Sequence, residues 1–281
     1  MIDESVELRE VAGPSALGGG RRRAYELLYL IAVNDFKKTY FGTVLGYVWS
    51  IARPLMMFGV LLVVFTHIFR LGSKVPHYSD FLLFDIVLFG FFQESTVMAV
   101  GSIVGHEAVV RKTQFPRLVI PLSVVFTSLF NLALNLLVAF AFILFGGISP
   151  RWTWLLLIPL LLALFVITTA ICMIVSALYP RFRDVGIIWT VFSTALFYAT
   201  PVLYPVSALH ANLRAVIALN PLAPLFDLAQ RWITNPRTPW PDARVMGGPW
   251  RLVIAITLYL VICGLAVWIF RREAPRIAEE L

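Results

Sequence analysis

The side chains that most often bind phosphate or metal ions are present, but their spacing supports neither kind of site. No lysine follows a glycine, as the Gly-Lys-Ser/Thr loop that cradles the phosphates of ATP requires. The four histidines have no partner four residues away and no neighbouring cysteine, so they lack the spacing of a zinc site. A Gly-x-Ser-x-Gly nucleophile motif is also missing. We therefore predict that the chain has no catalytic residue, no metal site and no cofactor of its own.

Two carboxylates, Asp85 and Glu94, lie within one long apolar segment. They are nine residues apart, so on a helix they project to opposite faces and cannot form one carboxylate pair. We expect Asp85 to be solvated near the outer interface. Glu94 lies deeper and must face protein or a water-filled path, because lipid exposure at the bilayer centre costs at least about 2.5 kcal/mol. Glu94 is therefore a candidate either for a pore or for a structural hydrogen bond.

The composition predicts that lipid surrounds most of the chain. Hydrophobic residues make up 59% of the sequence and charged residues 14%, which is more apolar than a soluble domain. The net charge is +7. In so apolar a chain, basic residues more often set membrane topology and contact anionic lipid than bind nucleic acid. We predict a membrane protein with no nucleic-acid partner.

Apolar segments of about 20 residues are long enough to cross a bilayer as helices, and the sequence contains six of them. Lys and Arg are concentrated on the face that carries both termini, which places both termini in the cytoplasm. The predicted spans are residues 51–70, 81–105, 119–145, 153–179, 185–204 and 251–270.

The remaining segments differ in pattern. Residues 1–23 are polar and predict a flexible cytoplasmic arm, and residues 271–281 predict a cytoplasmic tail. Residues 24–50 repeat apolar side chains at helical spacing, as an amphipathic helix at the membrane interface does. Within residues 206–233, two apolar stripes are each too short to span the bilayer. These two helices could lie flat on the outer face or dip back into the membrane.

The fold class follows from these segments. We predict an all-α integral membrane protein with six transmembrane helices in residues 51–270, an N-terminal amphipathic interface helix and two short extracellular re-entrant or gate helices. The gate candidates are Pro201, Tyr204, Leu209, Leu213, Asn220, Leu225 and Trp232.

Aromatic side chains are dense along the second and fifth predicted spans. Most aromatics in such helices face lipid or neighbouring helices, but their flat apolar faces could also stack on sugar rings along a conduit. The candidates for a substrate channel are Phe84, Phe91, Phe92, Glu94, Trp189, Phe192, Phe197 and Tyr198.

Two short cytoplasmic segments carry charge. Residues 106–118 form a charged, proline-bounded loop, which together with the interface helix could dock a soluble partner. A second turn contains Arg181, Arg183 and Asp184, a charge cluster that orients the helices at the interface.

Several short motifs recur in an order that is typical of one family. They are Phe41-Gly-Thr-Val-Leu-Gly-Tyr-Val-Trp-Ser50 ahead of Arg53-Pro54-Leu55, Phe115-Pro116-Arg117, Arg181-Phe182-Arg183-Asp184, Phe197-Tyr-Ala-Thr-Pro-Val-Leu-Tyr-Pro205 and Asn220-Pro221-Leu222. In this order, and over nearly all of the chain after Arg23, the sequence resembles the ABC-2-type permease subunits that export lipid-linked polysaccharides, such as O-antigen, teichoic acid and mycobacterial galactan.

The resemblance implies a homodimer in a bacterial plasma (inner) membrane, with two copies of a cytoplasmic ABC ATPase that bind ATP and Mg, and a channel along the dimer axis. It implies that Phe91 and Phe92 match an aromatic pair of the family, and that the short outer helices form a gate. The family usually has Asn where Arg53 stands. The residues that would receive the ATPase are Lys37, Lys38, His106, Glu107, Arg111, Lys112, Phe115 and Arg117.

The expected function is therefore the transport subunit of an exporter for a polyprenyl-diphosphate-linked glycan, without an ATPase site of its own. An exporter of drugs or small lipids is an alternative from the same class. A membrane-embedded lipid-modifying enzyme would need polar residues clustered at one depth, whereas Asp85, Glu94 and Asp184 are dispersed. A proton-coupled transporter would need more buried ionisable groups or repeated, broken helices.

Overall fold

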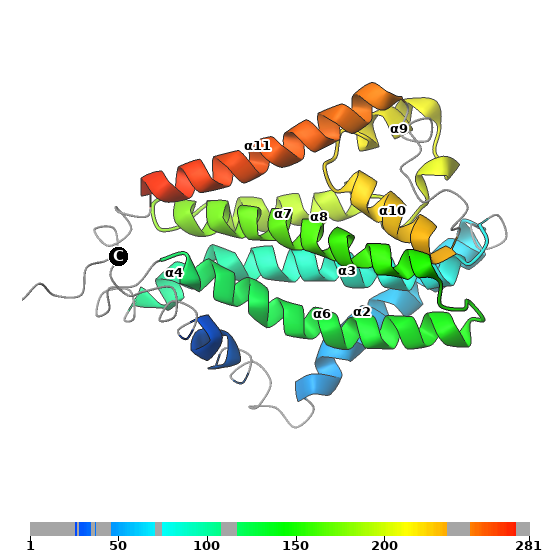
Figure 1. The fold of residues 1–281 in the computed structure, drawn as a ribbon, viewed down its shortest axis with the longest axis horizontal. Coiled ribbons are helices and arrows are strands. Elements are labelled where there is room, and N and C mark those ends of the chain that lie inside the picture. Colours follow the sequence, from blue (N-terminus) through cyan, green and yellow to red (C-terminus); the bar gives the residue numbers. More distant parts are fainter. Residues whose placement is uncertain are drawn as a thin grey trace, which may run out of the picture.

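The computed structural model of the 281-residue chain describes residues 26, 28–34, 37, 46–70, 75–107, 117–234 and 248–273, and all regular elements in these ranges are helices (Figure 1). The all-α prediction is confirmed for this part of the chain. The elements are α2 (Gly46–Val63), η1 (Val64–Ile68), α3 (Tyr78–Val100), α4 (Ser102–Gly105), α6 (Val119–Phe145), η2 (Trp152–Leu156), α7 (Leu157–Leu178), α8 (Val185–Ala199), η3 (Val206–Ala208), α9 (Ala211–Ile217), α10 (Ala223–Thr234) and α11 (Pro249–Glu273).

In the part of the chain that the structure describes, five helical stretches are long and apolar enough to cross a membrane, so the protein is a multi-pass membrane protein. Each overlaps a predicted span. The helix of the first span, α2, begins at Gly46, inside the range predicted for the interface helix. The five stretches are Val48–Ile68, Tyr78–Val100, Val119–Phe145, Trp152–Leu178 and Pro249–Glu273.

The predicted span at residues 185–204 is shorter in the structure. Its helix, α8, has 15 residues and is about 22 Å long, whereas the hydrocarbon core is about 30 Å thick. The helix ends because Pro201 follows Thr200, and a residue before proline is pushed out of the helical region. Thr200 has the extended backbone (φ −97°, ψ 143°) that this rule predicts. Among the described residues, five helical stretches are long enough to span a membrane, and α8 is shorter than all of them.

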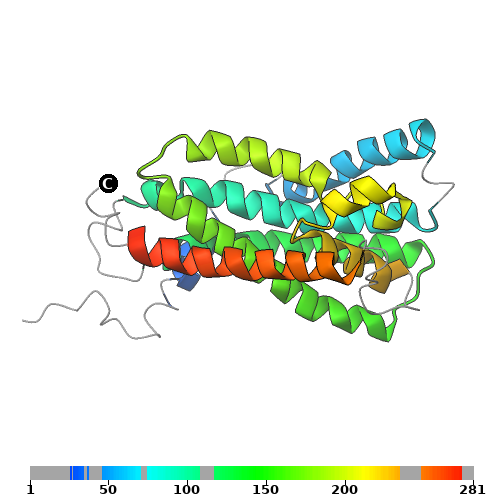
Figure 2. The same ribbon diagram turned by 90° about the horizontal axis from the view of Figure 1, so that it is seen from above.

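Helix α3 is the centre of the bundle. It packs against α2, α6, α7, α8 and α10, and most of its side chains are buried. Helix α11 packs on α7, on the outside of the bundle. Figure 2 shows α8 and α2 along the same edge of the molecule, where many of their apolar side chains are exposed.

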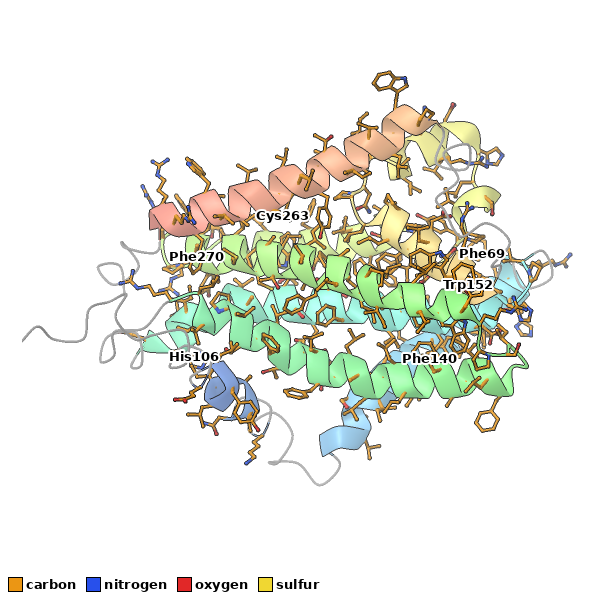
Figure 3. The ribbon with its side chains drawn as sticks, viewed as in Figure 1. Phe69, His106, Phe140, Trp152, Cys263 and Phe270 are labelled. Atoms are coloured by element: carbon orange, nitrogen blue, oxygen red, sulfur yellow. The ribbon has the colours of Figure 1, made fainter. Side chains whose placement is uncertain are left out.

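The two ends of the bundle have different contents (Figure 1). The helical residues 28–34, α4 and the C-terminal end of α11 lie at one end, which we call the α4 end. Helix α10 and η1 lie at the other, which we call the α10 end. Figure 3 shows His106 and Phe270 at the α4 end, and Phe69 and Trp152 at the α10 end.

Candidate functional site

The chain that follows α8 folds back onto the bundle. It turns at residues 200–205, forms η3 and α9, and returns as α10, which packs against α3, α7 and η2. Phe226 and Ala229 of α10 are fully buried. Buried irregular backbone needs hydrogen-bond partners within the protein, because no water is present to supply them.

Three side chains from distant elements supply these partners. Asn220 Nδ2 donates to Ala199 O (3.2 Å) and to Thr200 Oγ1 (2.8 Å). Gln230 Nε2 of α10 donates to Pro201 O at 2.7 Å. Tyr78 Oη of α3 donates to Leu203 O at 2.9 Å. We call Tyr78, Asn220 and Gln230 the α8 cap, because they donate hydrogen bonds to the backbone carbonyls of the residues at which α8 ends and the chain turns.

Gln230 also binds Asp85. Its Nε2 donates to Asp85 Oδ2 at 2.7 Å, and both side chains are buried. The expectation that Asp85 is solvated is therefore wrong, because α10 covers the face of α3 that carries it. One turn earlier in α10, Asp227 forms an ion pair with Arg231 (Oδ2 to Nε, 2.8 Å). The same C-terminal half of α10 is also held by Thr153, whose hydroxyl donates to Trp232 O at 2.8 Å.

Glu94 faces other helices. Asn131 Nδ2 of α6 donates to Glu94 Oε1 at 2.9 Å, and Asn135 Nδ2 donates to Asn131 O at 2.9 Å and to Ser50 O of α2 at 3.3 Å. The guanidinium of Arg53 interacts electrostatically with the Glu94 carboxylate. Asp85 and Glu94 contact different helices, which confirms that they form no carboxylate pair.

Five of the predicted aromatic residues, all except Phe84 and Phe91, take part in a series of ring contacts between α3 and α8. Ring centroids are 6.5 Å apart for Phe92 and Trp189, 5.6 Å for Trp189 and Phe192, and 5.2 Å for Phe197 and Tyr198. Phe89 of α3 is not among the predicted channel residues, but it connects the Phe92 rings to the Phe197 rings. Its ring centroid lies 5.5 Å from that of Phe92 and 5.2 Å from that of Phe197.

Burial divides the channel candidates into two groups. Phe84, Phe91, Phe92 and Phe197 are buried inside the subunit, and Trp189 and Glu94 are half-buried. Only Phe192 and Tyr198, both on α8, are exposed, at 53% and 60%. A side chain without accessible surface packs against its neighbours and cannot contact a substrate. In this arrangement the accessible rings among the candidates are therefore those of Phe192 and Tyr198.

The gate candidates lie in and around the segment that folds back. Pro201 and Trp232 are buried, Tyr204, Leu209, Asn220 and Leu225 are half-buried, and Leu213 is exposed. Asn220 and Pro201 take part in the bonds of the α8 cap, whereas Tyr204 Oη donates to Tyr198 O at 2.7 Å. Arg214 donates to Ser207 O (3.0 Å) and Leu209 O (2.8 Å), which joins α9 to η3.

The α4 end brings together several docking candidates. Leu28 and Ile31 pack on a small cluster that includes Ile103, Ile120 and Phe270, and Thr127 Oγ1 of α6 donates to Ala32 O at 3.2 Å.

His106 Nδ1 lies 2.8 Å from Ser102 O, and burial lowers the pKa of the Arg117 guanidinium from its ordinary value. Lys37 and Glu107 are also described, Lys37 as exposed and Glu107 as half-buried. Lys38, Arg111, Lys112 and Phe115 lie outside the described residues.

The turn before α8 is built around Tyr179. Arg183 lies over the Tyr179 ring (5.1 Å to the centroid) and Arg181 over Phe182 (5.3 Å). The Tyr179 ring fills the space beside Gly186, where an added Cβ would approach Tyr179 Cε2 to 3.1 Å. Asp184, the third predicted charge, is exposed just before α8.

Sequence reasoning missed the residues that hold the fold-back segment. Tyr78, Thr153, Asp227 and Gln230 received no role. One signal was available: a polar residue inside an apolar helix indicates a hydrogen bond to another helix, as Asn131 and Asn135 also illustrate. The sequence does not reveal the partner, because Asp85 and Gln230 are 145 residues apart.

Comparisons with known proteins give consistent results. The profile of the family described as "ABC-2 type transporter" matches residues 26–231. An O-antigen export system permease protein RfbA of Klebsiella pneumoniae is 31% identical over 259 residues, which cover 92% of this chain and 95% of that protein. A protein of the same name from Myxococcus xanthus is 28% identical over 249 residues, which cover 88% of this chain and 93% of that protein.

Proposed function

Because the chain belongs to the ABC-2 type transporter family, we propose that it is the membrane permease subunit of a polysaccharide exporter. The observation that carries the substrate class is the alignment with an O-antigen export permease over 95% of that protein's length. The cargo we propose is a glycan linked to a polyprenyl diphosphate. The family implies an ABC ATPase partner, and we propose that two copies of it bind ATP and Mg and drive transport.

The exposed apolar edge supports a homodimer. Ile187, Ile188 and Val191 of α8 are between 65% and 72% exposed, and Val60 of α2 on the same edge is 65% exposed. A path wide enough for a glycan does not fit inside a subunit whose central helix is buried. We propose that the path runs between two copies, along α8, and that the exposed Phe192 and Tyr198 rings contact the sugars.

The proposed orientation places the α4 end in the cytoplasm. Docking of the ATPase would then use the helical residues 28–34 together with the loop at residues 106–118. Helix α8 and the segment after it would complete a sixth crossing, so that both termini lie in the cytoplasm. Motion at the Tyr179 turn would pass to α8 as a rigid helix, and from α8 to its cap at the α10 end, where α9 and α10 serve as the outer gate.

The first experiment tests the ATPase partner. The chain is co-expressed with candidate ATPase subunits from the same source, purified through a tag on this chain, and assayed for vanadate-sensitive ATP hydrolysis. We expect a stable complex that is lost when residues 107–112 are scrambled. A stable, monomeric chain that binds no ATPase would contradict the proposal.

The second experiment tests the sugar track. Phe192→Ala and Tyr198→Ala in combination should leave the complex assembled and its ATP hydrolysis intact while slowing glycan export. Val253→Ala, an equally exposed apolar position on α11, is the matched control. Normal export with both rings removed would exclude the track, and an exporter of smaller cargo would then explain the complex better.

A further inference from the structure

A cleft of about 710 Å³ opens at the α10 end, between η1, the start of α3 and the end of α6. This volume is within the range of small-molecule sites. Three of the membrane-spanning helical stretches have an end beside it, at Ile68, Tyr78 and Phe145. The cleft therefore lies at the level of the lipid headgroups. It is separate from the proposed sugar track, because none of its lining residues comes from α8.

The lining of the cleft combines polar and apolar side chains. Thr66, His67, His77 and Asp80 are most of its polar residues, and Leu62, Val63, Phe142 and Phe145 are its large apolar residues. A lipid presents the same combination, since a charged headgroup is joined to hydrocarbon.

The polar groups divide into acceptors and donors. Asp80 Oδ2 lies 3.2 Å from His77 Nδ1, and in the tautomer that donates from Nδ1 to Asp80, the His77 Nε2 is an acceptor. Asp80 Oδ1 faces Gly146, where an added Cβ would approach it to 2.9 Å. On η1, the Thr66 hydroxyl is buried and has no hydrogen-bond partner among the described residues, and His67 carries a further ring N–H.

Local backbone shapes both walls. Phe69 N donates to Val64 O, five residues earlier, so η1 is a π-type turn, which is frequent at functional sites. His77 has φ +56°, a left-handed conformation that is rare outside glycine. Gly147, with φ +86°, ends α6, and Ile148 N then bonds back to Ile143 O.

We propose that this cleft binds the headgroup of a phospholipid that carries both a phosphate and a primary ammonium group, as phosphatidylethanolamine does. The ammonium group donates to Asp80 and His77, the phosphate accepts from Thr66 and His67, and the chains lie along Phe142 and Phe145. A choline headgroup has no N–H to donate. A glycerol headgroup leaves the Asp80 carboxylate unpaired beside a phosphate.

The test uses the purified full chain, stripped of lipid in detergent. Phosphatidylethanolamine, phosphatidylcholine and phosphatidylglycerol with identical acyl chains are titrated separately, and bound lipid is counted by native mass spectrometry. We expect phosphatidylethanolamine to bind about tenfold more tightly than either other lipid, the effect of one hydrogen-bonded charge pair. Equal affinities for the three lipids, or a preference for phosphatidylglycerol, would overturn the proposal.

Variants locate the site. Asp80→Asn should reduce phosphatidylethanolamine binding to the phosphatidylcholine level, and Gly146→Ala should do the same by displacing the Asp80 carboxylate. Asp184→Asn, the same change at the other end of the bundle, is the control and should keep the preference. Melting curves of the lipid-free variants identify misfolding. If Asp80→Asn fails to fold, Gly146→Ala still tests the site, because it keeps the Asp80 carboxylate. A preference that survives in both folded cleft variants would refute the assignment.

Discussion

Gln230→Leu is the substitution that most directly tests how the fold-back segment is held. Gln230 Nε2 donates two buried hydrogen bonds of 2.7 Å, to Asp85 Oδ2 and to Pro201 O. Leucine fills a similar volume but donates nothing, so both acceptors lose a partner. A buried acceptor left unpaired costs about 1 to 3 kcal/mol, whereas side-chain bonds measured in membrane proteins average about 0.6 kcal/mol. We expect the free energy of unfolding to fall by about 1 to 4 kcal/mol.

A double-mutant cycle separates this loss from a general packing defect. Asp85→Leu also breaks the bond, and it leaves the amide of Gln230 without its carboxylate. In the double variant neither group of the pair remains, so its loss should be smaller than the sum of the single losses by about 1 kcal/mol. Asp85→Asn keeps an acceptor for Gln230 and should cost less than Asp85→Leu.

Unfolding in mixed micelles with increasing SDS measures these changes, with far-ultraviolet circular dichroism as the readout. Thr257→Val is the control, because the Thr257 hydroxyl is exposed and its bond among the described residues lies within its own helix, to Val253 O at 2.8 Å. Strict additivity of the single losses, or a Gln230→Leu variant as stable as the control, would show that the bond does not hold α10 against α3.

Two further variants test the other contacts with the same assay. Gly186→Leu would force side-chain atoms into the Tyr179 ring, where a Cβ already approaches to 3.1 Å, and should cost about 1 to 3 kcal/mol. Gly264→Leu, which has open space around its Cβ position, should cost nothing comparable, and equal effects would exclude a packing role for Tyr179. Asn131→Leu removes the amide that donates to Glu94 and should lower stability by about 1 to 3 kcal/mol. Removing Glu94 as well should recover part of that loss, and no recovery would mean that the pair does not interact.

Local signals in the sequence predicted the helical fold well. The long spans were located because about 20 apolar residues in succession have no other favourable environment than a bilayer. The early end of α8 was also encoded locally, by Pro201, but the predicted span continued to residue 204. The two short helices before α11 were recognised from their apolar stripes, although the first is divided into η3 and α9.

The site was predicted less completely, because the role of a side chain depends on what covers it. Phe91 and Phe92 match an aromatic pattern, yet the structure buries both, so they pack within the subunit. Phe192 belongs to the same set of candidates and is exposed only because α8 lies at the edge of the bundle. No residue type or spacing distinguishes these cases before the helices are packed.

By itself, the sequence determined the membrane environment, the order of the helices and where α8 must end. These features depend only on residues that are close in the chain: the length of an apolar segment and the position of a proline. The tertiary structure alone decided which polar groups meet. Asp85 is buried rather than solvated because Gln230, 145 residues later, returns to it on α10, and the cleft beside Asp80 exists because three helices end together. Such pairings depend on how the helices rotate and cross, since every buried polar group must find a partner where packing places it.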